Sequence, residues 1–183
     1  MREFRDQALF GASAALAVAA LSLGASGGSA TRAPRIPPSL CRADETVLFQ
    51  CRIGASLAAV CGGHGARAYA QYRHGQPGRL DLIYPAATDG GPGTMTRAFT
   101  GFAGGGESQI RFVNHGVEYV IYSSTVRTGF GRDGHNNPRF SDGILMRRNG
   151  RRIADLACGG TLHPVDSGAA PGFLPEGEMV ARE

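Results

Sequence analysis

Histidine is the residue type best suited to catalysis or metal binding near neutral pH, and the five histidines of this chain form no recognisable site. No two of them stand two or four residues apart, the spacings that place paired ligands on one face of a strand or helix. A metal site would have to be assembled by the fold, so we interpret these residues as solvated turn histidines and predict no metal. They are His64, His74, His115, His135 and His163.

Serine and acidic residues give no catalytic pattern either. No Gly-x-Ser-x-Gly motif stands within residues 41–158, so the tight turn that exposes a hydrolase serine is missing there. The glycine-rich runs 90–93 and 104–106 lack the Lys-Ser/Thr pair of a phosphate-binding loop. The acids that could pair for glycoside hydrolysis show no spacing that selects two of them. These acids are Asp81, Glu107, Glu118, Asp133 and Asp142. We therefore expect a non-catalytic protein without a cofactor; an enzyme with a fold-assembled site is the least favoured alternative.

Arginine and aromatic residues, which protein-binding surfaces favour, gather in one predicted loop. This loop, 125–141, is seventeen residues long in a chain of otherwise short turns, and loops of that length are usually functional or mobile. A disordered insertion with solvated arginines is the alternative. The strand 117–124 joins the loop to the turn 114–116 but spans about 25 Å, so the loop must fold back for both to share one surface. The predicted contact residues are His115, Gly116, Tyr119, Arg127, Arg132 and Arg139.

Short apolar runs separated by turn residues must position these side chains. Runs of this kind predict an all-β fold, an antiparallel barrel or sandwich of about eight strands stabilised by disulfides. Asn149-Gly150 predicts a type I′ hairpin between the last two strands. The expected strands are 46–52, 57–62, 66–73, 79–84, 98–103, 108–113, 117–124, 142–148 and 151–157. Period-two alternation predicts a core of Val47, Phe49, Cys51, Ile53, Leu80, Leu82, Tyr84, Ile110, Phe112, Val117, Tyr119 and Ile121.

Four cysteines, Cys41, Cys51, Cys61 and Cys158, predict two disulfides, because the nine-residue intervals between the first three do not suit zinc. A turn at Gly54-Ala55 would place Cys51 opposite Ala58 and Cys61 opposite Leu48, on opposite faces of one hairpin. We therefore expect Cys41 to pair with Cys61 and Cys51 with Cys158. The two other connectivities remain open at this stage.

The N-terminal thirty residues have the three-part form of a secretory signal peptide, with arginines, an apolar run and then small residues. The apolar run is too short to span a bilayer, so we expect a periplasmic or secreted protein with no transmembrane segment in the mature chain. Residues 31–40 are interpreted as a linker, 41–158 as the β-domain, and 159–183, rich in glycine and proline, as a flexible acidic tail. The formal net charge of +4 is too small for a dedicated nucleic-acid binder.

Three motifs carry a resemblance to known proteins: Cys51-Arg-Ile-Gly54, Gly116-Val-Glu-Tyr119, and the Asn149-Gly150 ribbon ending in Cys158. Their order resembles small exported proteobacterial β-proteins of unknown function. More distantly it resembles the periplasmic and membrane-bound lysozyme inhibitors, small β-barrels in which a Ser-Gly-x-x-Tyr loop enters the lysozyme cleft. Gly116 and Tyr119 match that loop, whereas His115 occupies the serine position. Arg127-Thr-Gly129 resembles a second, basic loop of the family.

The function expected from these features is that of an exported non-catalytic binding module acting through exposed loops. The resemblance implies that its partner is a wall-degrading glycosidase of the lysozyme type, or another envelope component. The alternative is an envelope-associated protein whose arginines bind anionic polymer or lipid headgroups. Binding of a polyanion would weaken steeply with salt, whereas a packed interface would weaken less.

Overall fold

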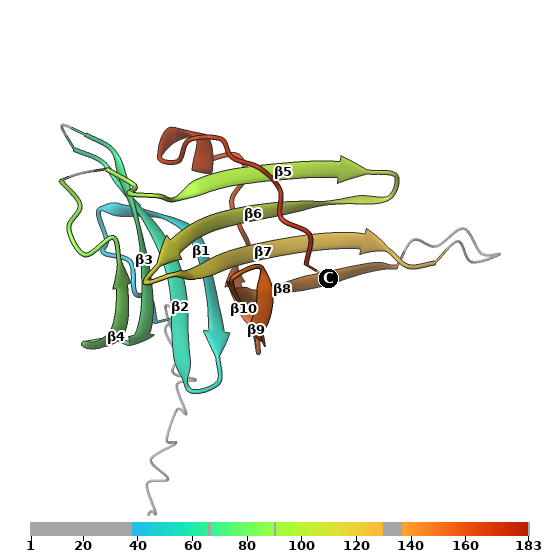
Figure 1. Cartoon of the computed structure of the whole chain (residues 1–183), viewed down its shortest axis with the longest axis horizontal. Helices are drawn as coiled ribbons and strands as arrows, with labels where there is room; N and C mark the ends of the chain where they lie inside the picture. The colour runs from blue at the N-terminus through green and yellow to red at the C-terminus, as the bar shows by residue number, and fades with distance from the viewer. Residues whose placement is uncertain (1–37, 66, 90, 130–136, 183) are drawn as a thin grey trace, which may run out of the picture. The chain divides into compact units, whose positions relative to one another are not determined.

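A computed structural model describes residues 38–65, 67–89, 91–129 and 137–182 (Figure 1). Sheet A comprises β1 (Glu45–Ile53), β2 (Ser56–Gly63), β3 (Tyr69–Gln76), β4 (Arg79–Tyr84) and β10 (Thr161–His163). Sheet B comprises β5 (Thr96–Phe102), β6 (Gly105–Asn114), β7 (Val117–Arg127), β8 (Pro138–Arg148) and β9 (Arg151–Ala157). Within these ranges the only helical element is a short 3-10 turn, η1 (Ala170–Gly172).

The two sheets are antiparallel and do not close into a barrel, so the predicted all-β fold is confirmed in its sandwich form. Their strand orders are β10-β1-β2-β3-β4 and β5-β6-β7-β8-β9. Each sheet is therefore a run of consecutive hairpins, except that β10 returns to pair with β1. The Asn149-Gly150 hairpin is confirmed, because both turn residues have the positive φ of a type I′ turn, 51° and 75°.

The strands of sheet B are longer than the sequence predicted at one end. β7 continues to Arg127 and β8 begins at Pro138, so residues 125–127 and 138–141 of the predicted 125–141 loop are paired strand backbone. Residues 130–136, which include Phe130 and the predicted contact residue Arg132, lie outside the described residues.

The core lies between the sheets, where Phe49, Ile110, Phe112 and Ile121 are buried as predicted. Stacked rings cross it: the Phe112 ring lies 4.7 Å from Tyr119 and 4.6 Å from Tyr84. The core also contains predicted residues that are buried (Cys51, Val117) or partly buried (Ile53, Leu82, Tyr84, Tyr119). The prediction for Val47 is wrong, because Val47 pairs with Cys61 on the other face of sheet A.

A second core prediction is wrong, because Leu80 is 37% exposed on the edge strand β4. Gly75 pairs with Leu80, but the preceding residue of β3, His74, pairs with Leu82. The extra residue on β4 is a β-bulge, which breaks the period-two alternation on which the prediction rested.

The disulfides join Cys41 to Cys61 and Cys51 to Cys158, the pairing that the hairpin faces predicted. Cys51 does pair with Ala58 and lies in the core, while Cys61 belongs to a small cluster on the other face of sheet A. The predicted partner of Cys61 was wrong by one residue. Cys61 pairs with Val47, because the register shifts between Val47 and Phe49.

The C-terminal residues differ from the loose tail that the sequence suggested. Beyond β9, the chain adds β10 to sheet A and then buries four apolar side chains against the core, so these residues complete the sandwich. Apolar residues in an irregular segment need no fixed spacing to be buried, which is why periodicity missed them. The four are Val165, Ala170, Phe173 and Leu174.

At the other boundary, Leu40 of the predicted linker is buried on the outer face of sheet A. The predicted signal peptide, 1–30, lies outside the described residues. The described residues contain no helix with the length and hydropathy needed to cross a membrane.

Candidate functional site

The structure separates the predicted contact residues into two groups at opposite ends of β7. His115 and Gly116 form the two-residue turn before Val117, with positive φ values of 48° and 73°. Arg127 ends the same strand and pairs with Pro138. Eleven residues of β7 separate the groups, which corresponds to about 35 Å of extended chain. The single surface that the sequence analysis considered is therefore not formed by the described residues.

Tyr119 does not extend from the turn into solvent. Its ring stacks on Phe112 at an interplanar angle of 4° and lies 6.1 Å from Tyr72. Burial raises the pKa of the Tyr119 phenol, although the charge of Arg148 opposes the effect. Tyr119 is thus part of the wall of the sandwich, whereas His115 and Gly116 are exposed at the turn.

Arg127 and Arg139 lie at the other end of sheet B, where their side chains leave opposite faces of the sheet. Arg139 pairs with Val126, directly beside Arg127. The backbone N–H of Arg127 donates to the carbonyl of Gly104 at 2.7 Å, which ties this end of β7 to the β5–β6 turn. Both arginines are exposed.

Three exposed phenylalanines accompany these arginines. The exposed fractions of Phe99, Phe102 and Phe140 are 61%, 45% and 69%. Figure 1 shows this end of β5, β6, β7 and β8 reaching away from sheet A. We call this group the aromatic end; Phe99, Phe140 and Arg127 lie on the core-facing side of sheet B, and Phe102 and Arg139 lie on the other side.

Strand register assigns Phe99 and Phe140 to the same side of sheet B. Phe140 pairs with Thr125, four residues from the core residue Ile121, and Phe99 pairs with Ser108, two residues from the core residue Ile110. Because even spacing keeps side chains on one face, both rings continue the core-facing side beyond the core. They stand on β5 and β8, three strand spacings or about 14 Å apart.

Glycines form the floor beneath Phe99. A Cβ atom on Gly106 would lie 3.2 Å from the Phe99 ring, and one on Gly101 would lie 3.8 Å from it. The absence of side chains at these two positions lets the ring lie flat along the strands while one of its faces stays open to solvent. Such a surface is rigid and apolar, which suits contact with another molecule.

A hollow of about 630 Å³ adjoins Phe140 where β9 ends and leaves the edge of β8. Asp142 shapes this hollow, because its carbonyl accepts from the Cys158 N–H at 2.9 Å and its carboxylate accepts from the Thr161 hydroxyl at 2.8 Å. Phe140 itself lies on β8 three residues before Gly143, the residue of β8 that pairs with the last residue of β9.

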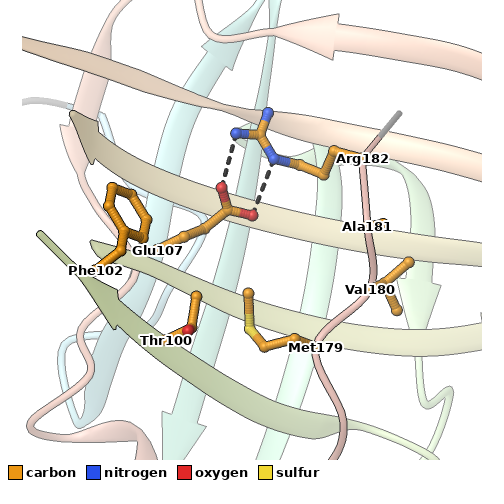
Figure 2. A pocket seen from close by; sticks show the side chains of 7 residues that line it. All are labelled: Thr100, Phe102, Glu107, Met179, Val180, Ala181 and Arg182. Carbon is orange, nitrogen blue, oxygen red and sulfur yellow. Dashed lines mark hydrogen bonds and ion pairs between the residues drawn. The ribbon is translucent and has the colours of Figure 1, made fainter. Parts of the chain in front are cut away.

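The other side of sheet B is crossed by the C-terminal residues (Figure 2). Arg182 donates from Nε and Nη2 to the two carboxylate oxygens of Glu107, at 2.9 and 2.7 Å. Gln109 exchanges hydrogen bonds with the backbone of Val180 at 2.8 and 2.9 Å. Burial acts to raise the pKa of Glu107, but hydrogen bonds from Arg182 and Gln109 outweigh it and lower that pKa. A hollow of about 600 Å³ remains between this segment and Phe102.

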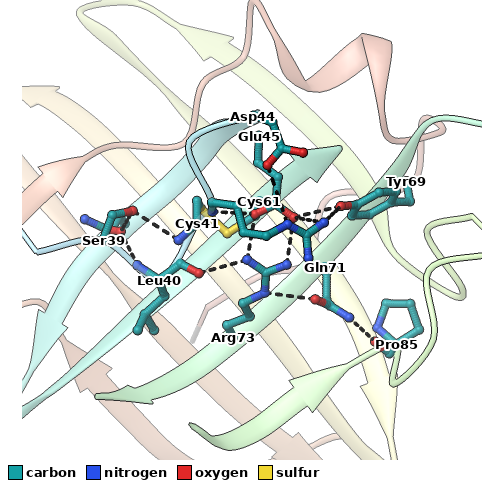
Figure 3. A network of polar contacts seen from close by, with 12 residues as sticks. Ser39, Leu40, Cys41, Asp44, Glu45, Cys61, Tyr69, Gln71, Arg73 and Pro85 are labelled. Carbon is teal, nitrogen blue, oxygen red and sulfur yellow. Dashed lines mark hydrogen bonds and ion pairs between the residues drawn. A yellow bond between two sulfur atoms is a disulfide. The ribbon is translucent and has the colours of Figure 1, made fainter. Parts of the chain in front are cut away.

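A second buried carboxylate lies on the outer face of sheet A (Figure 3). Arg73 donates to both carboxylate oxygens of Glu45, at 2.6 and 2.7 Å, and Tyr69 donates to the same carboxylate at 2.8 Å. Burial acts to raise the pKa of Glu45, but these bonds and the Arg42 backbone N–H lower it to about 2. The carboxylate is thus an ionised structural group with its acceptor oxygens occupied.

One group of metal-type ligands occurs within the described ranges: Cys41, Glu45 and Cys61. The two sulfurs are joined in a disulfide, and the carboxylate is held by Arg73. These atoms are therefore committed to other bonds and do not form a metal site.

Sequence reasoning named Arg127 and Arg139 of the aromatic end as candidates and did not name Phe99 or Phe102. Alternation of residue types gives the face of a strand on which a side chain lies, but it does not give where the opposite sheet ends. The available signal was the row of glycines at 101 and 104–106, which marks backbone without side-chain cover. Comparison of the chain with protein-family models, curated proteins and solved structures returned no match.

Proposed function

We propose that this protein is an exported, non-catalytic binding module and that the aromatic end is its docking surface. The observation that carries the proposal is the gathering of three exposed phenylalanines and two arginines at one end of sheet B. Phenylalanine offers a large contact area at low entropic cost, and aromatic and arginine side chains dominate the energy of protein interfaces. Export is supported by the two disulfides, which persist in oxidising compartments.

A protein partner is favoured over a polyanion by the way the arginines are used. Many of the described arginines contact carboxylates within the chain, which neutralises their charge locally. The three phenylalanine rings, by contrast, are between 45% and 69% exposed. A wall-degrading glycosidase is the first partner to test, on the strength of the resemblance to lysozyme inhibitors. In that case the His115–Gly116 turn, at the other end of β7, would be a separate contact.

The test begins with a pull-down from envelope extract and from a panel of lysozymes, using the mature oxidised protein. Affinity for each captured partner is then measured for Phe140→Ser and for the control Ile153→Ser, another exposed apolar residue (51% exposed) on β9. We expect Phe140→Ser to weaken binding roughly tenfold or more, as loss of an interface anchor does, and Ile153→Ser to leave it within about twofold.

Two results would reject the docking surface. Equal effects of the two substitutions would mean that Phe140 is no anchor. Binding that falls steeply with salt, survives Phe140→Ser and is lost in Arg127→Ser with Arg139→Ser would identify the polyanion alternative instead.

A further inference from the structure

The C-terminal segment, residues 178–182, crosses the outer face of sheet B without regular secondary structure (Figure 2). Two polar side chains of β6 lie beneath it: Gln109 is 1% exposed, and the Glu107 side chain is 12% exposed. Each makes two of its hydrogen bonds to the segment. A permanent cover would be held at least as well by apolar residues, whereas polar groups can be satisfied by water whenever the segment lifts. The floor of this face is therefore suited to being opened.

The Gln109 amide contacts the backbone of the segment and none of its side chains. Its Nε2 donates to the Val180 carbonyl at 2.8 Å, and its Oε1 accepts from the Val180 N–H at 2.9 Å. These two bonds resemble those that a neighbouring strand makes to one residue. Any extended residue other than proline can make both of them. Gln109 therefore fixes the position of an extended peptide without selecting its sequence.

Two side chains of the segment make the selective contacts. Arg182 pairs with both carboxylate oxygens of Glu107, and its guanidinium carbon lies 3.8 Å from the centre of the Tyr122 ring. Residues two positions apart in an extended chain point to the same side, so this face accepts an aliphatic residue followed at the second position by an arginine. The aliphatic residue, Val180, packs on a cluster formed by Val120, Tyr122 and Leu145.

The segment does not fill the space in which it lies. A hollow of about 600 Å³ runs beside it, and strand residues Thr100 and Phe102 line this hollow together with the segment. Phe102 is 45% exposed, so apolar area is left for a larger side chain to cover. A peptide from another molecule can therefore gain contacts that the protein's own segment lacks.

We propose that the outer face of sheet B is a groove for an extended peptide of a partner protein, with an aliphatic residue and an arginine two positions later. The protein's own C-terminal segment occupies this groove intramolecularly, and a partner must displace it. Glu107 and the Tyr122 ring select the arginine, and Gln109 holds the backbone. This inference is independent of the proposed docking at the aromatic end. The two surfaces share only Phe102, which no test of the groove changes.

The probe is a fluorescent synthetic peptide with the sequence of residues 176–183, Glu-Gly-Glu-Met-Val-Ala-Arg-Glu. Its acceptor is the mature oxidised protein carrying Val180→Ser and Arg182→Met, which weaken the intramolecular segment and leave the groove residues intact. We expect fluorescence anisotropy to show saturable binding to this acceptor, at least tenfold tighter than to the parent. In the parent, the linked segment competes at a high effective concentration.

A second peptide, carrying Arg182→Met, tests the selection of arginine. We expect it to bind the acceptor at least tenfold more weakly than the probe does. The substitution makes the peptide more acidic, and the protein has a formal net charge of +4. General electrostatic attraction would therefore strengthen binding of the second peptide, which separates it from recognition by the groove.

Two variants of the acceptor test the carboxylate assigned to the arginine. Glu107→Gln removes its charge, and we expect the probe to bind at least tenfold more weakly. Glu118→Gln is the matched control on the same face of sheet B, where Glu118 pairs with Arg111 and Arg147, and it should bind the probe within about twofold of the acceptor.

The parent protein provides a measurement that does not depend on a weakened segment. The probe peptide with an N-terminal nitroxide, added in excess, should broaden the backbone amide signals of β6 and β7 around Gln109 and Tyr122. The signals of sheet A should remain sharp.

Three results would overturn the proposal. Equal affinity for the two peptides, or unchanged affinity in Glu107→Gln, would show that the groove does not select arginine. Absence of both binding to the acceptor and broadening in the parent would make the segment a permanent cover. A parent protein that dimerises with rising concentration, but stays monomeric as Arg182→Met, would assign the groove to exchange of segments between two copies of this chain.

Discussion

The outer faces of the two sheets are covered by the two ends of the described chain. Each face contains a Glu–Arg ion pair, but the two pairs differ in which part of the chain supplies the arginine. On sheet A the pair is Glu45 and Arg73, and on sheet B it is Glu107 and Arg182. In both, two guanidinium nitrogens meet two carboxylate oxygens. On sheet A, however, both partners belong to strands, and Arg73 also donates to the carbonyl of Leu40 at 2.8 Å. On sheet B the arginine belongs to the segment that does the covering.

Exposure and covalent linkage separate the two covers further. The Arg73 side chain is 6% exposed and the Arg182 side chain 27%. The N-terminal cover is fixed by the Cys41–Cys61 disulfide, whereas hydrogen bonds and the contact of Arg182 over the Tyr122 ring, at 3.8 Å, hold the C-terminal cover. An ion pair between strands under a covalently fixed cover is part of the fold, while one made by an unlinked segment can open without unfolding the sheet beneath it.

The largest difference between the two pairs should appear when each arginine is removed. Arg73→Met leaves the Glu45 carboxylate buried without its main partner, and we expect it to lower the free energy of unfolding by about 3–5 kcal/mol. Arg182→Met should lower it by only about 1 kcal/mol, because Glu107 can gain water when the segment lifts. Urea denaturation of both variants measures this contrast. Similar losses would show that the two covers are equivalent.

A somewhat smaller effect is expected when the covalent fixing of the N-terminal cover is removed. Cys41 and Cys61 are separated by 20 positions, and closing a loop of that size stabilises a fold by about 3 kcal/mol in the chain-entropy model. We expect Cys41→Ser with Cys61→Ser to lose about 2–3 kcal/mol. Amide exchange should become faster only at residues 39–45 and the adjoining edge of β2. Without its disulfide, the N-terminal cover would open locally, as we expect of the C-terminal cover. Unchanged exchange at residues 39–45 would mean that Arg73 alone holds the cover.

The smallest expected effect is the loss of stability at acidic pH that results from protonation of Glu45. The folded pKa of Glu45 is about 2, below its ordinary value of 4.5, so the stabilisation is complete above pH 4.5 and is lost as the pH falls toward 2. Lowering the pH from 7 to 3 should reduce the free energy of unfolding by about 2 kcal/mol through protonation linked to Glu45. The pKa of Glu107 is also lowered, in the same direction. A carboxyl-carbon NMR titration in which Glu45 titrates near 4.5 would contradict the expected difference from an ordinary glutamate.

Local sequence rules predicted the strands and the face of each cysteine, because both depend on neighbours within a hairpin. Asn149-Gly150 and the opposite faces of Cys51 and Cys61 are of this kind. The same rules failed at Leu80 and at the partner of Cys61, where β-bulges shift the alternation by one residue. Such bulges depend on contacts across the sheet and leave no clear trace in a single strand.

Features that depend on three-dimensional fit were not predictable from single strands. Phe173 and Leu174 are buried because they fill a gap beside the core, although their surroundings in sequence resemble a flexible tail. At the candidate site, Arg127 and Arg139 were identified by residue type. The exposure of Phe99 depends on where sheet A ends, and that of Phe102 on where the C-terminal segment crosses the other side, which no property of β5 alone reveals.

The opposite faces of Cys51 and Cys61 also bear on oxidative folding. Cys51 must wait for Cys158, 107 positions later, while Cys41 and Cys61 are available as soon as the first hairpin is made. During that interval Cys51 is at risk of mispairing with a nearer thiol. Because the β1–β2 hairpin turns Cys51 and Cys61 to opposite sides of the sheet, this local structure keeps them apart. The hairpin thereby disfavours the wrong Cys51–Cys61 disulfide until Cys158 is available.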